Sequence, residues 1–146
     1  MALVCKLNLY NFWLFIPYLL ARYKVFVRED GRLLFTEFDL QDFTSSHYVL
    51  LHQGHVIGTA RVIYQANVAQ IGRIAVIKKY RNQGYGKLLM RQLISMIQET
   101  HKTQTVSLLA LEPNLVSFYM KLGFKEDGIV YLEQLPFIKM SKLLHN

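Results

Sequence analysis

Hydrophobic and polar residues follow two different periods along this chain of 146 residues. Residues 47–51 and 56–64 are rich in aliphatic and β-branched residues, and Gln53-Gly54 between them is typical of a hairpin turn. A second turn near residues 65–67 leads into another apolar run at 69–77. We therefore expect three neighbouring antiparallel strands.

A helical period replaces this pattern after the third strand. Apolar residues recur at intervals of three and four from Leu89 to Ile97, with charged and amide residues between them, which predicts an amphipathic helix from Lys87 to Gln98. The next expected strand is 105–110. Because a helix connects it to the strand at 69–77, these two strands should be parallel.

The remaining segments predict flanking helices and two last strands. The apolar run Leu9–Leu20 is expected to form a first helix packed on the sheet, and residues 30–45 a loop with room for a short helix. Residues 114–122 predict a shorter helix that Gly123 ends.

Two strands should follow from Phe124, interrupted at Leu135-Pro136. The pattern as a whole predicts an α/β fold with a mixed, mostly antiparallel sheet flanked by helices. At this length we expect a single domain of residues 1–146.

Glycines and basic residues gather where the third strand turns into the amphipathic helix. A strand that turns through glycines into a helix leaves backbone N–H groups at the positive end of the helix dipole, which suits an anion with several phosphates. The candidate anion-binding residues are Arg81, Asn82, Gln83, Gly84, Tyr85, Gly86 and Lys87. An ordinary glycine turn with solvated lysines is the alternative. A Walker loop is excluded because Leu88 follows Gly86-Lys87, and the dinucleotide spacing fails at Leu89.

This turn resembles motif A of the GNAT family of N-acyltransferases, whose Arg/Gln-x-x-Gly-x-Gly/Ala loop holds the pyrophosphate of acetyl-CoA. Arg81, Gly84 and Gly86 stand at the matching positions. The resemblance covers most of residues 20–143. Residues 22–29 look like the family's first helix, 55–61 like its third strand, and 118–124 like the helix-to-strand junction of motif B. The resemblance implies a GNAT-type fold, acetyl-CoA as cosubstrate and no metal.

The resemblance also implies roles for individual residues. Backbone N–H groups of Ile74, Ala75 and Val76 would bind the pantetheine arm and polarise the acyl carbonyl. Tyr119, within Phe-Tyr-x-x-x-Gly-Phe, would be the general acid for the departing thiolate, because a phenol keeps its proton at neutral pH. A half-buried core tyrosine is the alternative for this position. Asn114 is the candidate for a further pantetheine contact.

Three positions depart from the family pattern. Gly72 stands where many relatives carry glutamate, Glu112 where they carry an amide residue, and Phe137 where close relatives often have histidine. No general base is therefore assigned. Glu29, Glu112 and Glu133 are candidates, and deprotonation of the amine through water is equally consistent with the sequence.

Composition limits the classes of partner. The formal net charge is +7, but the basic residues are scattered, so a polyanionic cosubstrate and a solvated basic surface explain the charge better than a nucleic-acid site. The apolar run Leu9–Leu20 is too short for a spanning helix and is followed by no cleavage site, so we expect no stable membrane insertion and leave interfacial contact open. The single Cys5 fits a reducing compartment, and a cytoplasmic protein is expected.

The histidines predict no metal site. His52, His55 and His101 are interpreted as solvated surface groups, because no cysteine or carboxylate completes a ligand set with them. His47 could instead face the acceptor site.

The sequence thus predicts an N-acetyltransferase that moves an acetyl group from acetyl-CoA to a primary amine by direct attack within a ternary complex. A CoA-binding sensor that has lost catalysis is the alternative, and a basic nucleic-acid-binding protein is the third hypothesis. The acceptor, a small amine or a peptide amine, is not defined by the sequence, and a homodimer is left open.

Overall fold

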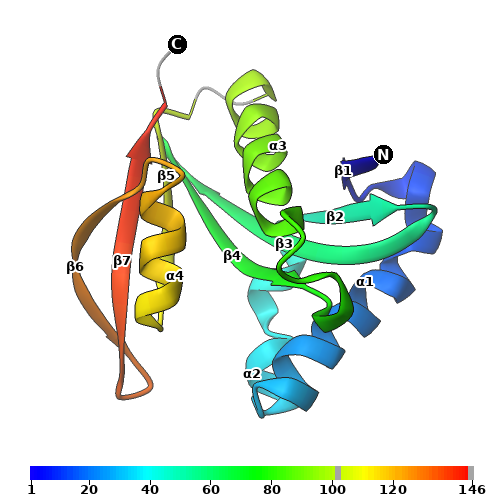
Figure 1. Cartoon of the computed structure of the whole chain (residues 1–146), viewed down its shortest axis with the longest axis horizontal. Helices are drawn as coiled ribbons and strands as arrows, with labels where there is room; N and C mark the ends of the chain where they lie inside the picture. The colour runs from blue at the N-terminus through cyan, green and yellow to red at the C-terminus, as the bar shows by residue number, and fades with distance from the viewer. Residues whose placement is uncertain (101–102, 145–146) are drawn as a thin grey trace.

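A seven-stranded sheet in the order β1-β2-β3-β4-β5-β7-β6 organises the computed structural model, which describes residues 1–100 and 103–144, apart from the side chains of Phe35 and Thr100 (Figure 1). The strands are β1 (Ala2–Lys6), β2 (Ser46–His52), β3 (His55–Gln65), β4 (Val68–Val76), β5 (Thr105–Ala110), β6 (Lys125–Leu132) and β7 (Leu135–Leu143). Only the β4–β5 pair is parallel among the described strands, and the other pairs are antiparallel. The predicted mixed, mostly antiparallel sheet is confirmed.

Helices cover both faces of this sheet. The α-helices are α1 (Phe15–Arg22), α2 (Leu34–Glu37), α3 (Tyr85–Thr100) and α4 (Pro113–Met120). Shorter 3-10 segments are η1 (Leu9–Leu14), η3 (Leu40–Phe43) and η4 (Lys78–Tyr80), and η2 (Tyr23–Glu29) is a π-helix that continues α1. Buried residues of α3 and α4 share one core with Tyr48 and Leu50 of β2. Buried residues of α1 pack instead with Val49, which lies between Tyr48 and Leu50 in the sequence. Because successive side chains of a strand point to opposite faces, α1 lies on the face opposite α3 and α4.

The predicted amphipathic helix is confirmed as α3. Leu89, Met90, Leu93 and Ile97 are fully buried against the sheet. Burying a side chain of this size stabilises a fold by about 1.5–3 kcal/mol, so this one stripe is a main source of core stability.

Turn chemistry follows the sequence at three places. Gln53 and Gly54 have φ of 50° and 77°, as the predicted hairpin turn requires. The turn after β3 has Ala66 at φ 47°. Gly123 ends α4 at φ 89°, with its N–H donating to the Met120 carbonyl and the next N–H, of Phe124, donating to the Tyr119 carbonyl.

Two predictions about the strands were wrong. No strand was expected before residue 47, yet β1 pairs with β2 at the edge of the sheet. The chain turns between the last two strands at Glu133-Gln134, where both φ values are positive, and not at Leu135-Pro136. Pro136 lies opposite Tyr131 of β6 and is accommodated inside β7 because the pairing of β7 with β5 begins only at Ile138, so no β5 carbonyl needs its missing N–H.

The apolar run Leu9–Leu20 does not form one helix buried on the sheet. It is divided between η1 and α1, with a non-helical Asn11 inside η1. Tyr18 is buried, whereas Phe12, Trp13 and Ile16 are exposed. The prediction that this whole run packs on the sheet was therefore wrong, because Tyr18 is the only buried residue of Leu9–Leu20.

Candidate active site

The two parallel strands separate from each other in the middle of the sheet (Figure 1). Their pairing consists of Val68 with Thr105, Ala69 with Val106 and Gln70 with Ser107. Beyond Gln70, no described residue pairs with β4 on this edge. The strand segment that contains Ile74, Ala75 and Val76 therefore borders the opening, where an extended ligand could hydrogen-bond to backbone as an added strand does.

A bulge turns the backbone of β4 at this opening. The register with β3 shifts between the pairs Thr59–Ala75 and Arg61–Gly72. Arg73 in the bulge has φ 51°, and its carbonyl accepts a hydrogen bond of 3.1 Å from the Thr59 hydroxyl. Such a bulge redirects the strand and the groups beyond it.

Gly58 allows β3 and β4 to approach closely beside this bulge. A Cβ at position 58 would lie 2.9 Å from the carbonyl oxygen of Ala75 and 3.3 Å from the Cβ of Leu50. No such crowding exists at Gly72, where a Cβ would meet no described atom within 4 Å. Lack of space therefore does not explain why position 72 holds a glycine instead of a glutamate.

The predicted anion-binding turn lies between η4 and the first residues of α3. Asn82 and Gly84 adopt φ of 59° and 83°. The Leu88 N–H donates to the Gly84 carbonyl at 3.0 Å, so the N–H groups of Tyr85, Gly86 and Lys87 precede the first hydrogen bond of the helix. These are the groups that bind anions at a helix N-terminus.

Space is open over Gly84, whereas Gly86 faces a neighbouring ring. A Cβ at Gly84 would contact nothing within 4 Å, and one at Gly86 would have as its nearest neighbour a ring carbon of Phe118, at 3.6 Å. Since Phe118 belongs to α4, the start of α3 and the helix that carries Tyr119 lie next to each other. The turn and Tyr119 thus lie on neighbouring elements.

Two side chains of the turn brace it rather than extend into solvent. Arg81 forms an ion pair of 2.8 Å with Glu29, and its Nε donates to the Val76 carbonyl at 2.8 Å. Gln83 donates through Nε2 to the Lys79 carbonyl. Backbone N–H groups and the exposed lysines therefore remain the main candidates for phosphate contacts, and the ion pair makes Glu29 a poor candidate for the general base.

Tyr85 of the same turn contacts a histidine. Its hydroxyl lies 3.3 Å from Nε2 of His52, and both rings pack with the ring of Tyr80. Nδ1 of His52 is buried, so the interpretation of His52 as a solvated surface group was wrong. His55 is exposed as predicted, and His101 lies outside the described residues.

Tyr119 is buried in α4, with only 5% of its surface exposed. Its ring packs edge-on against Phe118 and Phe124, with centroid distances of 5.1 and 5.9 Å. Burial raises the pKa of Tyr119 to about 12, so the phenol is protonated at neutral pH. Asn114 and Glu112 are exposed at the other end of α4, where Glu112 is the N-cap residue and makes no capping hydrogen bond with its side chain.

Sequence reasoning missed a buried network of three arginines and three carboxylates, which we call the arginine–carboxylate network. Its members are Arg22, Arg61, Arg73, Glu37, Asp39 and Asp42. Arg22 and Glu37 are fully buried and lie 2.7 Å apart. Three acidic residues within six positions, and arginines within otherwise apolar segments, were the available signals.

This network fixes residues 34–43 onto the sheet. Arg61 of β3 pairs with Asp39 and Asp42 at 2.7 and 3.0 Å. Arg73 of the β4 bulge pairs with Glu37 and Asp39 at 3.0 and 3.1 Å. Burial alone would raise the pKa of Asp42, but the hydrogen bonds and charges of two arginines hold it below its usual value.

His47 belongs to this network and is not a solvated group. Its Nε2 lies 2.8 Å from the Asp42 carbonyl and its Nδ1 2.6 Å from the Tyr18 hydroxyl, which also accepts a hydrogen bond from Arg22. A neutral ring with its proton on Nε2 satisfies all three contacts. Burial lowers the pKa of His47, which favours the same neutral form.

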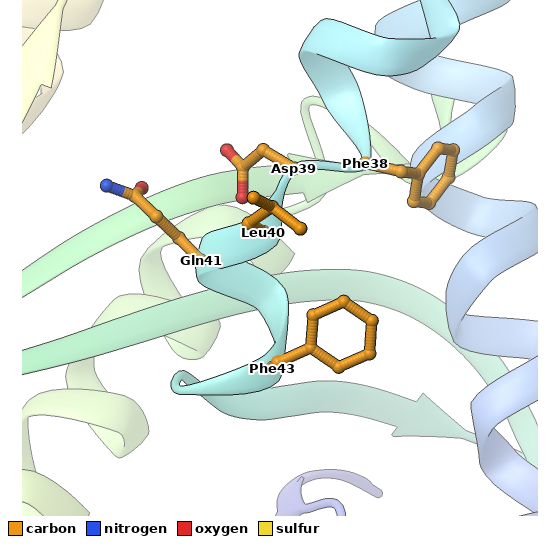
Figure 2. Close-up of a pocket in the computed structure, with 5 residues that line it drawn as sticks. All are labelled: Phe38, Asp39, Leu40, Gln41 and Phe43. Atoms are coloured by element: carbon orange, nitrogen blue, oxygen red, sulfur yellow. The ribbon is translucent and has the colours of Figure 1, made fainter.

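An open pocket of about 670 Å³ lies on η3 and the residue pair before it (Figure 2). Figure 2 shows the rings of Phe38 and Phe43 on one side, with the polar ends of Asp39 and Gln41 on the other. Leu40 also lines it. The ion pair between Asp39 and Arg73 places this pocket beside the bulge of β4.

Comparison with known proteins decides the family. The family described as an acetyltransferase (GNAT) domain matches residues 44–126, which include β4, the glycine turn and Tyr119. This chain belongs to the GNAT family of acetyltransferases. It is therefore an acyltransferase, as predicted from its sequence.

Individual relatives agree with this assignment. A Bacillus subtilis protein classed as an acetyltransferase is 32% identical over 127 residues, which cover 83% of this chain and 84% of that protein. A Lactobacillus plantarum structure classed as an N-acetyltransferase superposes with a TM-score of 0.86 at 25% identity and covers 99% of both chains. A GNAT acetyltransferase of Elizabethkingia anophelis, solved with acetyl-CoA bound, has the same fold, with a TM-score of 0.69 at 14% identity over 98% of both chains.

Two features of this GNAT protein lie in the segments for which the sequence predicts acetyl-CoA contacts. The opening beside Ile74 to Val76 has an unpaired strand edge, and the glycine turn has backbone N–H groups at the start of α3 and open space over Gly84. In the described residues, no group of three or more histidine, cysteine or acidic side chains is arranged to hold a metal ion.

Proposed function

We propose that this GNAT protein transfers the acetyl group of acetyl-CoA to a primary amine by direct attack within a ternary complex. The observation that carries the proposal is the separation of β4 from β5, with the glycine turn after β4 and α4, the helix that carries Tyr119, in contact with that turn through Phe118. An acyl-transfer site needs a held carbonyl, an anion site for the phosphates and a proton donor, and these three needs are met by neighbouring elements.

The chain's own residues have distinct roles in this proposal. The backbone of Ile74 to Val76 binds the pantetheine and holds the thioester carbonyl, and the start of α3 binds the pyrophosphate. The amine nitrogen attacks the carbonyl carbon, the C–S bond breaks, and the Tyr119 hydroxyl donates a hydrogen bond to the departing sulfur, which takes its proton from water. The amine gives its surplus proton to water, because Glu29 is held by Arg81 and no carboxylate stands at Gly72.

The pocket on η3 is the proposed entrance for the acceptor. It borders the β4 bulge and combines the apolar surfaces of Phe38, Leu40 and Phe43 with Asp39, whose carboxylate is paired with Arg61 and Arg73. An acceptor amine with an apolar body fits this lining better than a polyamine does, because apolar surface is stabilised by burial against these rings. A cytoplasmic location is part of the proposal, since the single cysteine suits a reducing compartment.

A CoA-binding sensor without catalysis is the second candidate. The observation that favours it is Gly72. This position has room for a side chain, but it holds a glycine where relatives often have a glutamate that could act as the base. Both candidates require the same cosubstrate site, so binding and turnover must be tested separately.

Binding is tested by thermal denaturation with acetyl-CoA and with desulfo-CoA. At about one hundred times the dissociation constant, a ligand that binds only the folded state stabilises it by about 2.7 kcal/mol. For a chain of this length the melting temperature should rise by roughly 5–10 °C. No shift with either ligand would refute the cosubstrate site.

A matched pair of glycine variants tests the place of binding. Gly84→Val and Gly54→Val both introduce a β-branched side chain at a positive φ, 83° and 77°, where a Cβ meets nothing within 4 Å. Both should lose similar stability, but only Gly84→Val should lose the acetyl-CoA shift. An equal shift in the two variants would contradict phosphate binding at the glycine turn.

Turnover is tested by free-thiol release from acetyl-CoA with a panel of amines of equal charge and increasing apolar size. Amine-dependent release that grows with apolar size would support both the enzyme and its acceptor pocket. Binding of acetyl-CoA without release for any amine would favour the sensor.

A further inference from the structure

Apolar side chains line the outer side of the first helical segments, where no described element covers them. Phe12, Trp13, Ile16, Leu19, Leu20 and Tyr23 are between 40% and 69% exposed. We call these six residues the outer stripe. Side chains of this size at these exposures present on the order of 600 Å² of apolar surface, which equals the largest patch of an ordinary monomer.

The outer stripe is a continuous face of the helix. From Phe12 its members recur at intervals of three and four, which places them on one side of α1 and its extensions. The buried residues Tyr18, Ala21, Arg22 and Val25 fall on the opposite side, against the sheet and the arginine–carboxylate network. The sheet explains only this second face, so the apolar character of the first requires another partner.

Within residues 1–28, the segment that carries the outer stripe, all charged side chains have one sign. The first acidic residue in the sequence is Glu29, so residues 1–28 contain none. Lys6, Lys24 and Arg28 are exposed there, whereas Arg22 is buried with its carboxylates. If a second copy packed on this face about a two-fold axis, these cations would approach one another, and residues 1–28 would supply no carboxylate to neutralise them. An anionic surface would neutralise them.

The composition of the outer stripe also indicates a lipid surface. Trp13 and Tyr23 are residue types that concentrate at the boundary between headgroups and acyl chains, and Phe12, Ile16 and Leu20 supply apolar surface for the acyl side. No helix within residues 1–100 and 103–144 is long and apolar enough to cross a bilayer. A helix with such a face and basic flanks is expected to lie along the membrane plane.

We propose that the outer stripe docks this protein reversibly on anionic lipid bilayers, with Lys6, Lys24 and Arg28 contacting the headgroups. Lys24 follows Tyr23 directly, so at least one cation adjoins the stripe. The docking leaves α3 and α4 on the opposite face of the sheet, away from the lipid.

Trp13 makes the proposal directly measurable because it is the only tryptophan of the chain. Vesicles of phosphatidylcholine with about one third phosphatidylglycerol should shift its emission to shorter wavelength, and lipids brominated on the acyl chains should quench it. Pure phosphatidylcholine vesicles should bind at least about tenfold less protein, and raising the salt should weaken binding to the anionic vesicles.

Ile16→Glu and Ile129→Glu form a matched pair. Both replace an exposed isoleucine, 69% and 59% accessible, but Ile129 lies on the edge strand β6. Ile16→Glu should lower vesicle co-sedimentation about tenfold or more, because a carboxylate replaces apolar surface at the interface and repels the headgroups. Ile129→Glu should bind vesicles as the parent protein does, and thermal melting checks that both variants fold.

Several results would overturn the proposal. One is an unchanged Trp13 emission with anionic vesicles, and another is equal binding to neutral and anionic vesicles. A third is an equal change of vesicle binding in Ile16→Glu and Ile129→Glu. A parent protein that elutes as a dimer, becomes a monomer in Ile16→Glu and ignores vesicles would assign the outer stripe to self-association instead. None of these measurements depends on acetyl transfer.

Discussion

Replacing Tyr119 by phenylalanine tests the chemical core of the proposed mechanism. The change keeps the ring that packs against Phe118 and Phe124 and removes only the hydroxyl. Because the side chain is 95% buried and the ring contacts remain, the melting temperature and the affinity for acetyl-CoA should change little.

The expected loss of rate follows from the pKa of the phenol. Burial raises the pKa of Tyr119 to about 12, whereas an ordinary thiol has a pKa of about 8.5. Complete proton transfer to the thiolate would therefore be uphill by roughly 3.5 pKa units, or about 5 kcal/mol. Tyr119 should then act mainly by donating a hydrogen bond to the sulfur as negative charge develops. Removing one such donor typically lowers kcat by about 10²–10³.

The same pKa predicts the pH profile. A group that must be protonated, with a pKa of about 12, causes no loss of activity between pH 8 and 10. In that range the rate should rise or level as the acceptor amine loses its proton. A rate that falls by half near pH 10 in the parent, but not in Tyr119→Phe, would indicate an ordinary phenol and contradict the burial argument.

Steady-state thiol release with a good acceptor gives kcat and KM for the parent and both tyrosine variants. Tyr131→Phe is the control, because Tyr131 is 68% exposed on β6 and its hydroxyl should have no role. The reasoning is refuted if Tyr119→Phe keeps the parent kcat, or if the loss lies entirely in KM.

The remaining predictions concern the strands and the network that position the site. Gly58→Ala should lower the free energy of unfolding by about 1–3 kcal/mol and weaken acetyl-CoA binding, because its Cβ meets a backbone carbonyl of β4. Gly72→Ala, the control, should leave the free energy of unfolding unchanged or raise it slightly. Equal free energies of unfolding for the two variants in chemical denaturation would contradict the crowding at Gly58. Arg22→Met should cost about 3–5 kcal/mol, since it leaves Glu37 buried without its 2.7 Å partner, and a loss below about 1 kcal/mol in the same assay would argue against this account. Because the pKa of His47 is lower in the folded than in the unfolded state, the unfolded state binds more protons. The free energy of unfolding should therefore fall as the pH drops below about 6.5. A melting temperature that stays constant from pH 7 to 5 would contradict this.

Elements with a strong local signal were predicted correctly from the sequence. The hairpin at Gln53-Gly54, the helix α3 and the end of α4 at Gly123 each depend on neighbours in the chain, through φ preferences and helical periodicity. The parallel β4–β5 pair was also predicted, because a helical crossover leaves little choice of direction.

Elements whose stability comes from distant partners were missed. β1 is short and becomes a strand only by pairing with β2, more than 40 positions away in the chain. Pro136 suggested a break between the last two strands. The structure has no break there, because the pairing of β7 with β5 begins only after Pro136. The run Leu9–Leu20 read as a core helix, since hydrophobicity along the chain does not tell which of two apolar faces meets the sheet.

By itself, the sequence determined the family, the glycine turn and the candidate acid Tyr119, because motif spacing and backbone conformation are local properties. Only the tertiary structure decided that Arg81 is held by Glu29, that His47 and Arg22 belong to a buried charge network, and that β4 leaves β5 at the site. Each of these depends on side chains or strand edges that meet across the fold. Charge pairing and burial over such distances are fixed by packing and not by sequence neighbours.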